Sequence, residues 1–323
     1  MRAIITKKHG GPEELVIAKV DTPRPKAGHV LIAVKAFGVN RAETYMRRGK
    51  WGVTAMIGGI ECVGTVEACP GGEYSRGTKV AALMGGMGRT IDGSYAEFTN
   101  PPVSNVAAID TDLPWEHLAA LPLSYASAWT CLTDSLALSK GQTIVIRGGT
   151  SAFGQAAINI AADLGAKIIA TSRQTERLSR LEELGANRGE LERSNLTAEL
   201  AEAGQVDAVL DLVGEQTALD SLELLRRGGR VCLAGFLGSM DYPGNPKFLD
   251  EMPAGVFLTL FGSSVFGAPN CPLSAVPFQW IVEKAAAGTY AASPALVLPF
   301  GQIREAHETM EADQAKGKIV IVV

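Results

Sequence analysis

A glycine-rich segment, GGTSAFG at positions 148–154, lies between two stretches of different pattern. The run TIVI at 143–146 is short and uninterruptedly apolar, typical of a parallel strand buried on both faces. Residues 155–164 carry apolar side chains at helical spacing. A glycine loop between strand and helix brings backbone N–H groups and a helix N-terminus close to phosphate. We therefore predict a pyrophosphate-binding loop formed by Gly149, Thr150, Ser151, Ala152, Phe153 and Gly154. The alternative is a helix entry whose glycines only relieve crowding.

The end of the next apolar run, KIIAT at 167–171, indicates which dinucleotide is bound. Folds that prefer NAD usually place Asp or Glu there, to bind the ribose 2′-OH. Here Ser172 and Arg173 follow, and no carboxylate appears before Glu176. A hydroxyl and a guanidinium suit a 2′-phosphate, and Arg177 lies one helical turn further on. These residues predict that the bound cofactor is NADPH. The alternative is that each arginine is simply solvated and binds no phosphate.

Composition excludes several other classes of protein. The net charge is −4 and no Lys/Arg run occurs, so a nucleic-acid role is not predicted. The five Cys are odd in number and lack C-x-x-C spacing, and the four His are scattered. A disulfide framework or a metal centre is therefore not expected, and reduced thiols in the cytoplasm fit better. The N-terminal apolar run, residues 3–5, is too short for a signal peptide.

The pattern of elements changes twice along the chain. The first third has strand-like runs and little helical pattern, and strands then alternate with helices, which implies a doubly wound parallel sheet. After about residue 264 the alternation stops, and a final strand at 318–323 needs a partner in the first part. We predict a mostly β domain over 1–122 and 264–323, with a nucleotide-binding domain inserted at 123–263. The predicted strands are 1–5, 30–37, 62–68, 79–84, 143–146, 167–171, 206–213 and 230–234, and the predicted helices are 155–164, 176–184, 217–225, 281–287 and 303–313.

The stretch 252–282 contains no Asp, Glu, Lys or Arg. Proline and glycine interrupt it too often for an unsupported membrane-spanning helix. We expect no membrane association and predict buried strand and loop there, or a subunit interface.

A series of segments in this chain resembles the zinc-free quinone oxidoreductase branch of the medium-chain dehydrogenase/reductase superfamily. The resemblance runs nearly end to end. It is carried by HGGPEEL, GVNRAETYMRRG, GGIECVGTVEACPG, DGSYAEF, LPLSYASAWTCL, AADLGAKIIATSRQTERLSRLEELGA, DAVLDLVG, LLRRGGRVCLAG and GKIVIVV. It implies an α/β fold in which a Rossmann doubly wound sheet is inserted into a mostly β, GroES-like catalytic domain. The loop GGTSAFG departs from the family's A-A-x-G-G-V-G, so the approach to pyrophosphate should differ in detail.

The resemblance also bears on metal chemistry. Zinc-dependent members carry Cys and His at the positions that Asn40 and Ile60 occupy in G-V-N and G-I-E. The family's four-Cys lobe is absent near residue 90. A catalytic zinc needs about three protein ligands. We therefore predict no metal.

Without a metal, other groups must polarise a substrate carbonyl. Asn40 can donate from its amide and Tyr45 from its phenol. We expect these residues, five apart in a loop, to converge on one oxygen. The matching positions line the active site in quinone reductases, so the resemblance implies the same role here. The alternative is that Asn40 caps a turn and Tyr45 is partly buried core. The resemblance implies a further cofactor contact at Ser127. Val213 ends one predicted strand, and Gly235 and Phe236 end another, where α/β sheets place ligands, so we predict cofactor contacts there too.

The implied activity is hydride transfer from NADPH, in a cleft between the domains, to a quinone or another α,β-unsaturated carbonyl. Two alternatives remain: an enone or enoyl-thioester reductase, and a non-catalytic NADPH-binding redox sensor. The resemblance further implies a homodimer that forms through the edge of the Rossmann sheet.

Overall fold

The computed structural model describes residues 1–52, 54–214, 216–238 and 251–323. The chain divides into two compact units. The first comprises Met1–Ala126 and Ser263–Val323, and the second comprises Ser127–Gly262. The second unit is therefore an insertion into the first.

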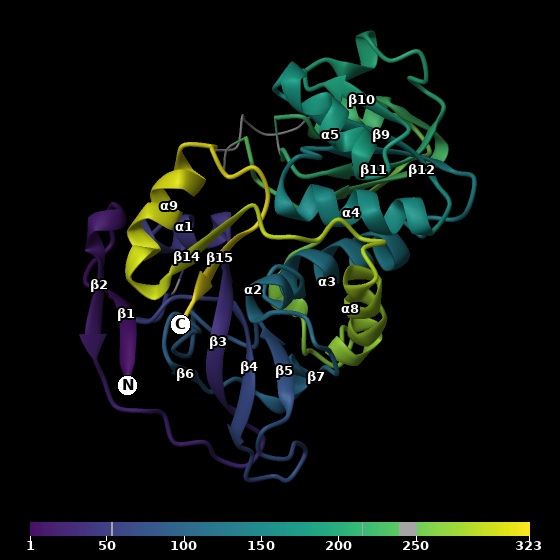
Figure 1. Ribbon diagram of the computed structural model, residues 1–323. Coiled ribbons are helices and arrows are strands. Elements are labelled where there is room, and N and C mark those ends of the chain that lie inside the picture. Colours follow the sequence, from purple (N-terminus) through teal and green to yellow (C-terminus); the bar gives the residue numbers. More distant parts are fainter. Residues whose placement is uncertain (53, 215, 239–250) are drawn as a thin grey trace. The chain divides into compact units, whose positions relative to one another are not determined.

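The second unit is built on a six-stranded parallel sheet in the order β10-β9-β8-β11-β12-β13. Four of these strands, β9 to β12, are labelled in Figure 1. The strand order is the doubly wound Rossmann order, with the reversal between β8 and β11. Its strands are β8 (Thr143–Arg147), β9 (Lys167–Ser172), β10 (Arg188–Leu191), β11 (Val206–Asp211), β12 (Leu225–Leu233) and β13 (Phe257–Leu260). Its helices are α4 (Ala152–Asp163), α5 (Leu178–Glu183) and α6 (Ala218–Glu223).

The first unit is built on a seven-stranded sheet in the order β14-β15-β3-β4-β5-β7, with β6 also paired to β3. The C-terminal strand β15 lies between β14 and β3 (Figure 1), so the predicted return of the chain end to the first part is confirmed. The strands are β3 (Leu31–Val39), β4 (Glu61–Ala68), β5 (Lys79–Leu83), β6 (Phe98–Thr99), β7 (Val106–Ala108), β14 (Leu296–Pro299) and β15 (Ile319–Val322), besides the separate hairpin of β1 (Arg2–Thr6) and β2 (Leu15–Lys19). The helices are α1 (Arg41–Arg47), α2 (Trp115–Leu118), α8 (Phe278–Ala286) and α9 (Ile303–Glu311), and α3 (Pro122–Thr130) crosses the boundary between the units.

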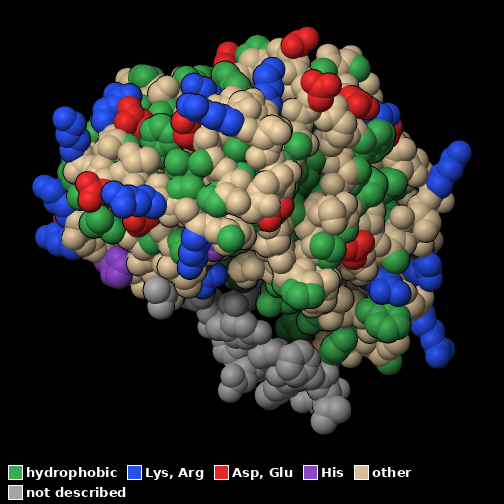
Figure 2. All heavy atoms as spheres, turned by 90° about the horizontal axis from the view of Figure 1, so that it is seen from below, with side chains coloured by type: hydrophobic (Ala, Val, Ile, Leu, Met, Phe, Trp, Pro, Cys, Tyr) green, Lys and Arg blue, Asp and Glu red, His purple; other side chains and the backbone are tan. Residues whose placement is uncertain are grey.

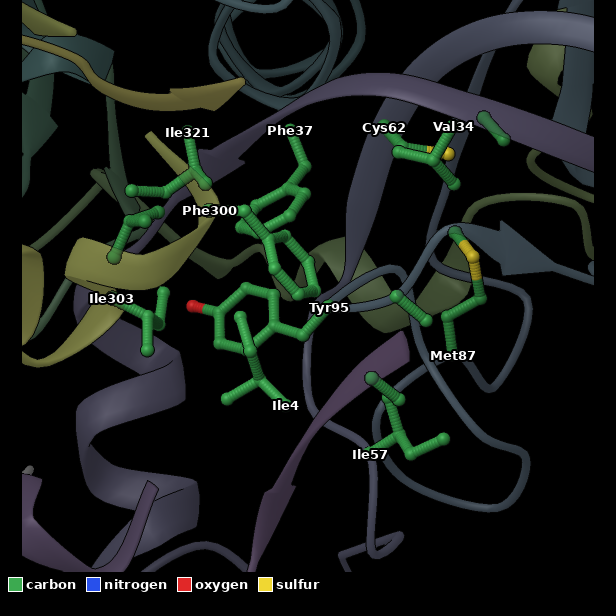
Figure 3. Close-up of a cluster of buried hydrophobic side chains, with 14 of the residues drawn as sticks. Ile4, Val34, Phe37, Ile57, Cys62, Met87, Tyr95, Phe300, Ile303 and Ile321 are labelled. Carbon is green, nitrogen blue, oxygen red and sulfur yellow. The ribbon is translucent and has the colours of Figure 1, made fainter. Parts of the chain in front are cut away.

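Aromatic side chains fill the centre of the first unit's core (Figure 3). Phe37 of β3 stacks on Tyr95 with ring centroids 4.7 Å apart, and Phe300 meets Phe37 edge-on. Phe37 and Tyr95 are almost completely buried. In the second unit, the apolar runs of the central strands are buried as expected, with Val145, Val209 and Val231 at zero exposure.

Two sequence predictions need correction. The segment from Asn40 to Tyr45 was expected to be a loop, but residues 41–45 belong to the helix α1, which begins after Asn40. The charge-free stretch 252–282 does contain a strand, β13, but that strand is the edge of its sheet. Phe257 is 52 % exposed and Leu260 is 71 % exposed, so these side chains are not buried within the chain.

Within the described residues, no helix combines the length and apolar character needed to cross a bilayer. Figure 2 shows positive and negative side chains interspersed over the described residues of one face.

Candidate functional site

The glycine loop of the second unit opens helix α4. Ser151 is the N-cap of α4, and its Oγ accepts a hydrogen bond from the Gly154 N–H at 3.0 Å. Helix α4 begins at Ala152 rather than at the predicted residue 155, because the spacing of apolar side chains does not mark the cap or the first turn of a helix. The N–H groups of Ala152 and Phe153, in the first helical turn, have no acceptor within the helix. They remain available to an anionic ligand at the positive end of the helix dipole.

Two glycines allow this loop to pack against its neighbours. A Cβ atom at Gly154 would lie 2.5 Å from the Gly148 carbonyl oxygen and 2.7 Å from the Gly149 Cα. A Cβ atom at Gly149 would lie 3.0 Å from Leu181 and 3.1 Å from the Ala170 Cβ. The loop is also tied to β9, since Gly149 donates its N–H to the Thr171 carbonyl at 2.9 Å. Relief of crowding, the alternative role considered for these glycines from the sequence, is therefore part of what they do.

The carboxyl end of β9 carries the residues predicted to select NADPH. Ser172 is buried and its Oγ accepts a hydrogen bond from the Gln174 N–H. Arg173 is exposed, and Arg177 closes the 3-10 turn Thr175–Arg177 that precedes α5. All strands of this sheet are parallel, so the ends of β8 and β9 lie at one edge.

The loops after β11 and β12 reach the same edge. Asp211, completely buried at the end of β11, accepts hydrogen bonds from the N–H groups of Val213 and Gly214. Gly235 and Phe236 follow β12, and a Cβ at Gly235 would lie 2.6 Å from the Leu212 carbonyl oxygen. The structure therefore brings these predicted cofactor residues to the same edge as the loop. Ser127 is buried in α3.

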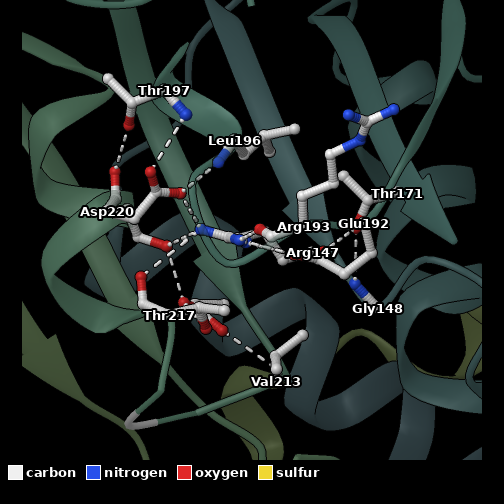
Figure 4. A network of polar contacts seen from close by, with 12 residues as sticks. Arg147, Gly148, Thr171, Glu192, Arg193, Leu196, Thr197, Val213, Thr217 and Asp220 are labelled. Carbon is white, nitrogen blue, oxygen red and sulfur yellow. Dashed lines mark hydrogen bonds and ion pairs between the residues drawn. The ribbon is translucent and has the colours of Figure 1, made fainter. Parts of the chain in front are cut away.

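Sequence reasoning missed a buried polar network beside this loop (Figure 4). Arg147, the last residue of β8, is completely buried and bonds Glu192 and Asp220. Thr171 donates its hydroxyl to Glu192 and accepts from the Gly148 N–H at 3.1 Å. The network thus fastens the loop to its sheet. The available signal was an arginine directly after the apolar run TIVI.

In the first unit, Asn40 precedes α1 and Tyr45 lies within it. Asn40 is the N-cap of α1, which agrees with the alternative in which it caps a turn. Its backbone N–H makes the capping contact, by donating to the Glu43 carboxylate at 2.6 Å. Tyr45 is half-buried, and its ring lies 6.2 Å from that of Trp51. Five positions correspond to about 1.4 helical turns. Convergence of the two side chains on one substrate oxygen therefore remains a prediction.

The amide of Asn40 contacts two buried charged groups that sequence reasoning did not select. Its Nδ2 donates to Glu61 Oε1 at 2.9 Å, and its Oδ1 accepts from Lys318 Nζ at 2.7 Å. Lys318 also forms an ion pair with Glu61. Neither the motif G-I-E nor the closing segment GKIVIVV reveals this contact, because the residues are 257 positions apart.

A second buried cluster includes Glu43, a residue of α1. The Tyr95 hydroxyl bonds both Glu43 Oε2, at 2.8 Å, and His307 Nε2, at 3.1 Å. Burial raises the pKa of Glu43 to about 7, and burial with the nearby Arg47 lowers the pKa of His307 to about 3. Arg47 itself is buried and bonds Gly10 and Glu311, so its side chain serves the fold.

These two pKa shifts predict opposing effects on stability. The raised pKa of Glu43 gives stability that is present below pH 4.5 and lost as the pH rises through about 7. The lowered pKa of His307 gives stability that is present above pH 6.5 and lost as the pH falls through about 3. In the overlap, pH 4.5 to 6.5, the two slopes oppose each other. Glu43→Gln should therefore make stability rise more steeply with pH there than in the wild type. Urea unfolding across this range measures it, with the exposed Glu305→Gln as control; parallel wild-type and Glu43→Gln curves would contradict the assignment.

Among the residues that the structure describes, no three His, Cys, Asp or Glu side chains are grouped so as to hold a metal ion. Ile60, at the position of the family's histidine, is a buried apolar residue. None of the five cysteines, all within the part of the chain that the structure describes, is joined in a disulfide.

Comparison with known proteins assigns both units. Residues 26–111 match the family model "Alcohol dehydrogenase GroES-like domain", and residues 152–271 match "Zinc-binding dehydrogenase". A quinone oxidoreductase of Sus scrofa is 28 % identical over 100 % of this chain and 98 % of its own length. A 2-haloacrylate reductase of a Burkholderia species is 26 % identical, again over 100 % of this chain and 98 % of that protein.

Solved structures agree with these matches. A mycobacterial protein in complex with NADPH is 26 % identical, covers 100 % of both chains and superimposes with a TM-score of 0.86. A GroES-like unit with an inserted Rossmann sheet defines an oxidoreductase of the medium-chain dehydrogenase/reductase type. The chain belongs to the quinone oxidoreductase branch of that superfamily. The predicted fold class is confirmed.

Proposed function

We propose that this protein is an NADPH-dependent reductase that transfers hydride to a quinone or another α,β-unsaturated carbonyl without using zinc. One observation carries the proposal. At one edge of the second unit's sheet, a capped helix N-terminus stands beside a strand that ends at Ser172 and is followed by Arg173 rather than by a carboxylate. That combination suits a dinucleotide with a 2′-phosphate.

The residues of this edge fit the cofactor. Gly154 allows the loop to pack closely, since a Cβ atom there would clash with the loop backbone. In this arrangement the N–H groups of Ala152 and Phe153 are available to bind the pyrophosphate. Arg173, assisted by Arg177, would bind the 2′-phosphate. NADPH supplies the hydride. The protein's own task is to orient the cofactor and stabilise negative charge that develops on the substrate oxygen.

Asn40 and Tyr45 are the proposed donors to that oxygen, and solvent supplies the proton. Charge stabilisation by these groups would replace a metal ion. Elemental analysis of the purified protein tests the zinc-free proposal directly, because one bound zinc per chain in this site would contradict it.

Tyr45→Phe removes the phenolic donor and keeps the ring against Trp51. We expect kcat/KM for the carbonyl substrate to fall about tenfold, the effect of losing a hydrogen bond worth roughly 1 kcal/mol. Steady-state oxidation of NADPH measures this. An unchanged rate with every substrate tested would remove Tyr45 from the proposed site.

Arg173→Ala removes the proposed partner of the 2′-phosphate. Because NADH lacks that phosphate, we expect NADPH affinity to fall by at least about tenfold and NADH affinity to stay nearly constant. Titration calorimetry with both cofactors measures the two constants, with the exposed Arg180→Ala as a matched control. Equal losses for NADPH and NADH would contradict the assignment.

Reduction of an enone or enoyl thioester is the second candidate activity. The 2-haloacrylate reductase that this chain resembles favours it, since that protein's name indicates an α,β-unsaturated substrate. A screen of NADPH oxidation with quinones, enals, enones and enoyl thioesters separates the two activities. NADPH binding with no turnover of any of them would instead favour a redox sensor.

We also propose a homodimer that forms through β13 in the cytoplasm. The strand is the unpaired edge of its sheet among the described residues, and its exposed Phe257 and Leu260 offer an apolar surface. The solution mass by light scattering tests this.

A further inference from the structure

A buried ion pair of the first unit holds the Asn40 amide in one orientation. Lys318 Nζ donates to Asn40 Oδ1 at 2.7 Å, and Asn40 Nδ2 donates to Glu61 Oε1 at 2.9 Å. An ammonium has only donors and a carboxylate has only acceptors. Both partners therefore select the same orientation of the amide, and a flipped amide would lose both bonds.

Burial decides which member of this cluster a ligand can reach. Glu61 is completely buried, and its other oxygen, Oε2, accepts from the Leu123 N–H at 2.8 Å. Lys318 is 5 % exposed, whereas Asn40 is only half-buried. The bond to Glu61 uses one of the two amide hydrogens, which leaves the other for a substrate oxygen.

The chain provides space for this ion pair. A Cβ atom at Gly38 would lie 2.3 Å from Lys318 Cε and 2.5 Å from Glu61 Oε1. The three members come from neighbouring strands, because Asn40 follows β3, Glu61 begins β4 and Lys318 directly precedes β15. A buried ion pair adds little net stability over apolar side chains of similar volume. Stability alone therefore does not account for it.

We propose that Lys318 and Glu61 are positioning residues for the reduction. Glu61 fixes the Asn40 amide so that its remaining N–H donates to the substrate oxygen, and the Lys318 ammonium polarises the amide through Oδ1. This inference rests on the proposed function, in which Asn40 binds that oxygen. The oxygen gains an electron pair as hydride adds to the substrate and NADPH becomes NADP⁺, and a proton from solvent then completes the hydroxyl.

The proposed arrangement has a kinetic signature. A polarised amide stabilises an oxyanion more than a neutral carbonyl, so its contribution is larger in the transition state than in the bound substrate. Loss of the ion pair should therefore lower kcat and change KM little.

The test removes both charges together, because Lys318→Met alone would leave Glu61 buried without its partner. We expect the double variant Lys318→Met/Glu61→Gln to bind NADPH normally and to lose about tenfold in kcat, with KM within about threefold. In an Asn40→Ala background the same pair of substitutions should cost nothing further. An equal loss in both backgrounds would indicate a merely structural pair and overturn the inference. The single variant Lys318→Arg keeps the positive charge and should retain most of the wild-type activity.

A second measurement does not depend on turnover. The side-chain NH₂ signals of Asn40 in a ¹⁵N-labelled sample, assigned by their absence in Asn40→Ala, should shift in the double variant. They should remain in place in Lys79→Met, which removes a lysine that binds the Thr111 carbonyl in the same unit. Unshifted signals in the double variant overturn the inference whatever the activity. Shifted signals in a protein that reduces no carbonyl would support the positioning and reject the proposed function.

Discussion

Arg147→Met should lower the free energy of unfolding by about 3–5 kcal/mol, since it leaves buried carboxylates without their partner. The Arg147 side chain has no exposed surface and lies 2.6 Å from Asp220 and 2.5 Å from Glu192. Asp211, also completely buried, is held nearby through Ser221. Methionine fills similar volume but brings no charge, so the loss reports electrostatics rather than a cavity.

Urea denaturation followed by circular dichroism measures this loss. Arg226→Met is the matched control, because its ion pair with Asp207 in the same sheet has a half-exposed arginine, and exposed pairs contribute about 0–1 kcal/mol. The double variant Arg147→Met/Glu192→Gln should recover part of the loss. Similar small losses for Arg147→Met and Arg226→Met would show that the network of Figure 4 contributes little.

Gly154→Ala should weaken NADPH binding by about 10- to 100-fold, equivalent to roughly 1.4–2.7 kcal/mol. The added Cβ would lie 2.5 Å from the Gly148 carbonyl oxygen, which is backbone and cannot rotate away as a side chain can. The loop must therefore move away from the helix N-terminus, and the N–H groups proposed to bind pyrophosphate move with it. Fluorescence titration of NADPH measures the change.

The control for this variant is Gly301→Ala. A Cβ at Gly301 meets no atom within 4 Å, so NADPH binding and stability should both stay close to wild type. Wild-type NADPH affinity in Gly154→Ala would show that the loop tolerates displacement and that its close packing is not required for the cofactor.

Local pattern was sufficient to predict most strands and the glycine-rich connection between β8 and α4. Apolar runs such as TIVI are buried strands because a parallel sheet covered on both faces admits few polar side chains. The same logic could not reveal α1, because only seven residues form it and its buried positions include Glu43, Thr44 and Arg47. Hydrophobic periodicity detects apolar helix faces and misses a helix whose buried face is polar.

The polar clusters were beyond prediction for a different reason. Arg147 pairs with Glu192, and Lys318 pairs with Glu61, across separations of 45 and 257 residues. A charged residue in a sequence carries no sign of the partner that permits its burial. The residues predicted from family resemblance, Asn40 and Tyr45, gave the position of the candidate site, and the structure adds the charged groups that surround Asn40.

The position of β15 has a consequence for synthesis on the ribosome. This strand, Ile319–Val322, lies inside the first unit's sheet between β14 and β3 and pairs in register with residues 36–39. The described strands of the inserted second unit are complete by residue 260, so this unit can fold while the chain is still being made. The first unit, although begun earlier, must keep the β15-facing edge of β3 unpaired until residues 319–322 have been made and have left the exit tunnel. An exposed strand edge of this kind is open to wrong pairing, so the unit that is started first is the one that depends longest on protection from aggregation.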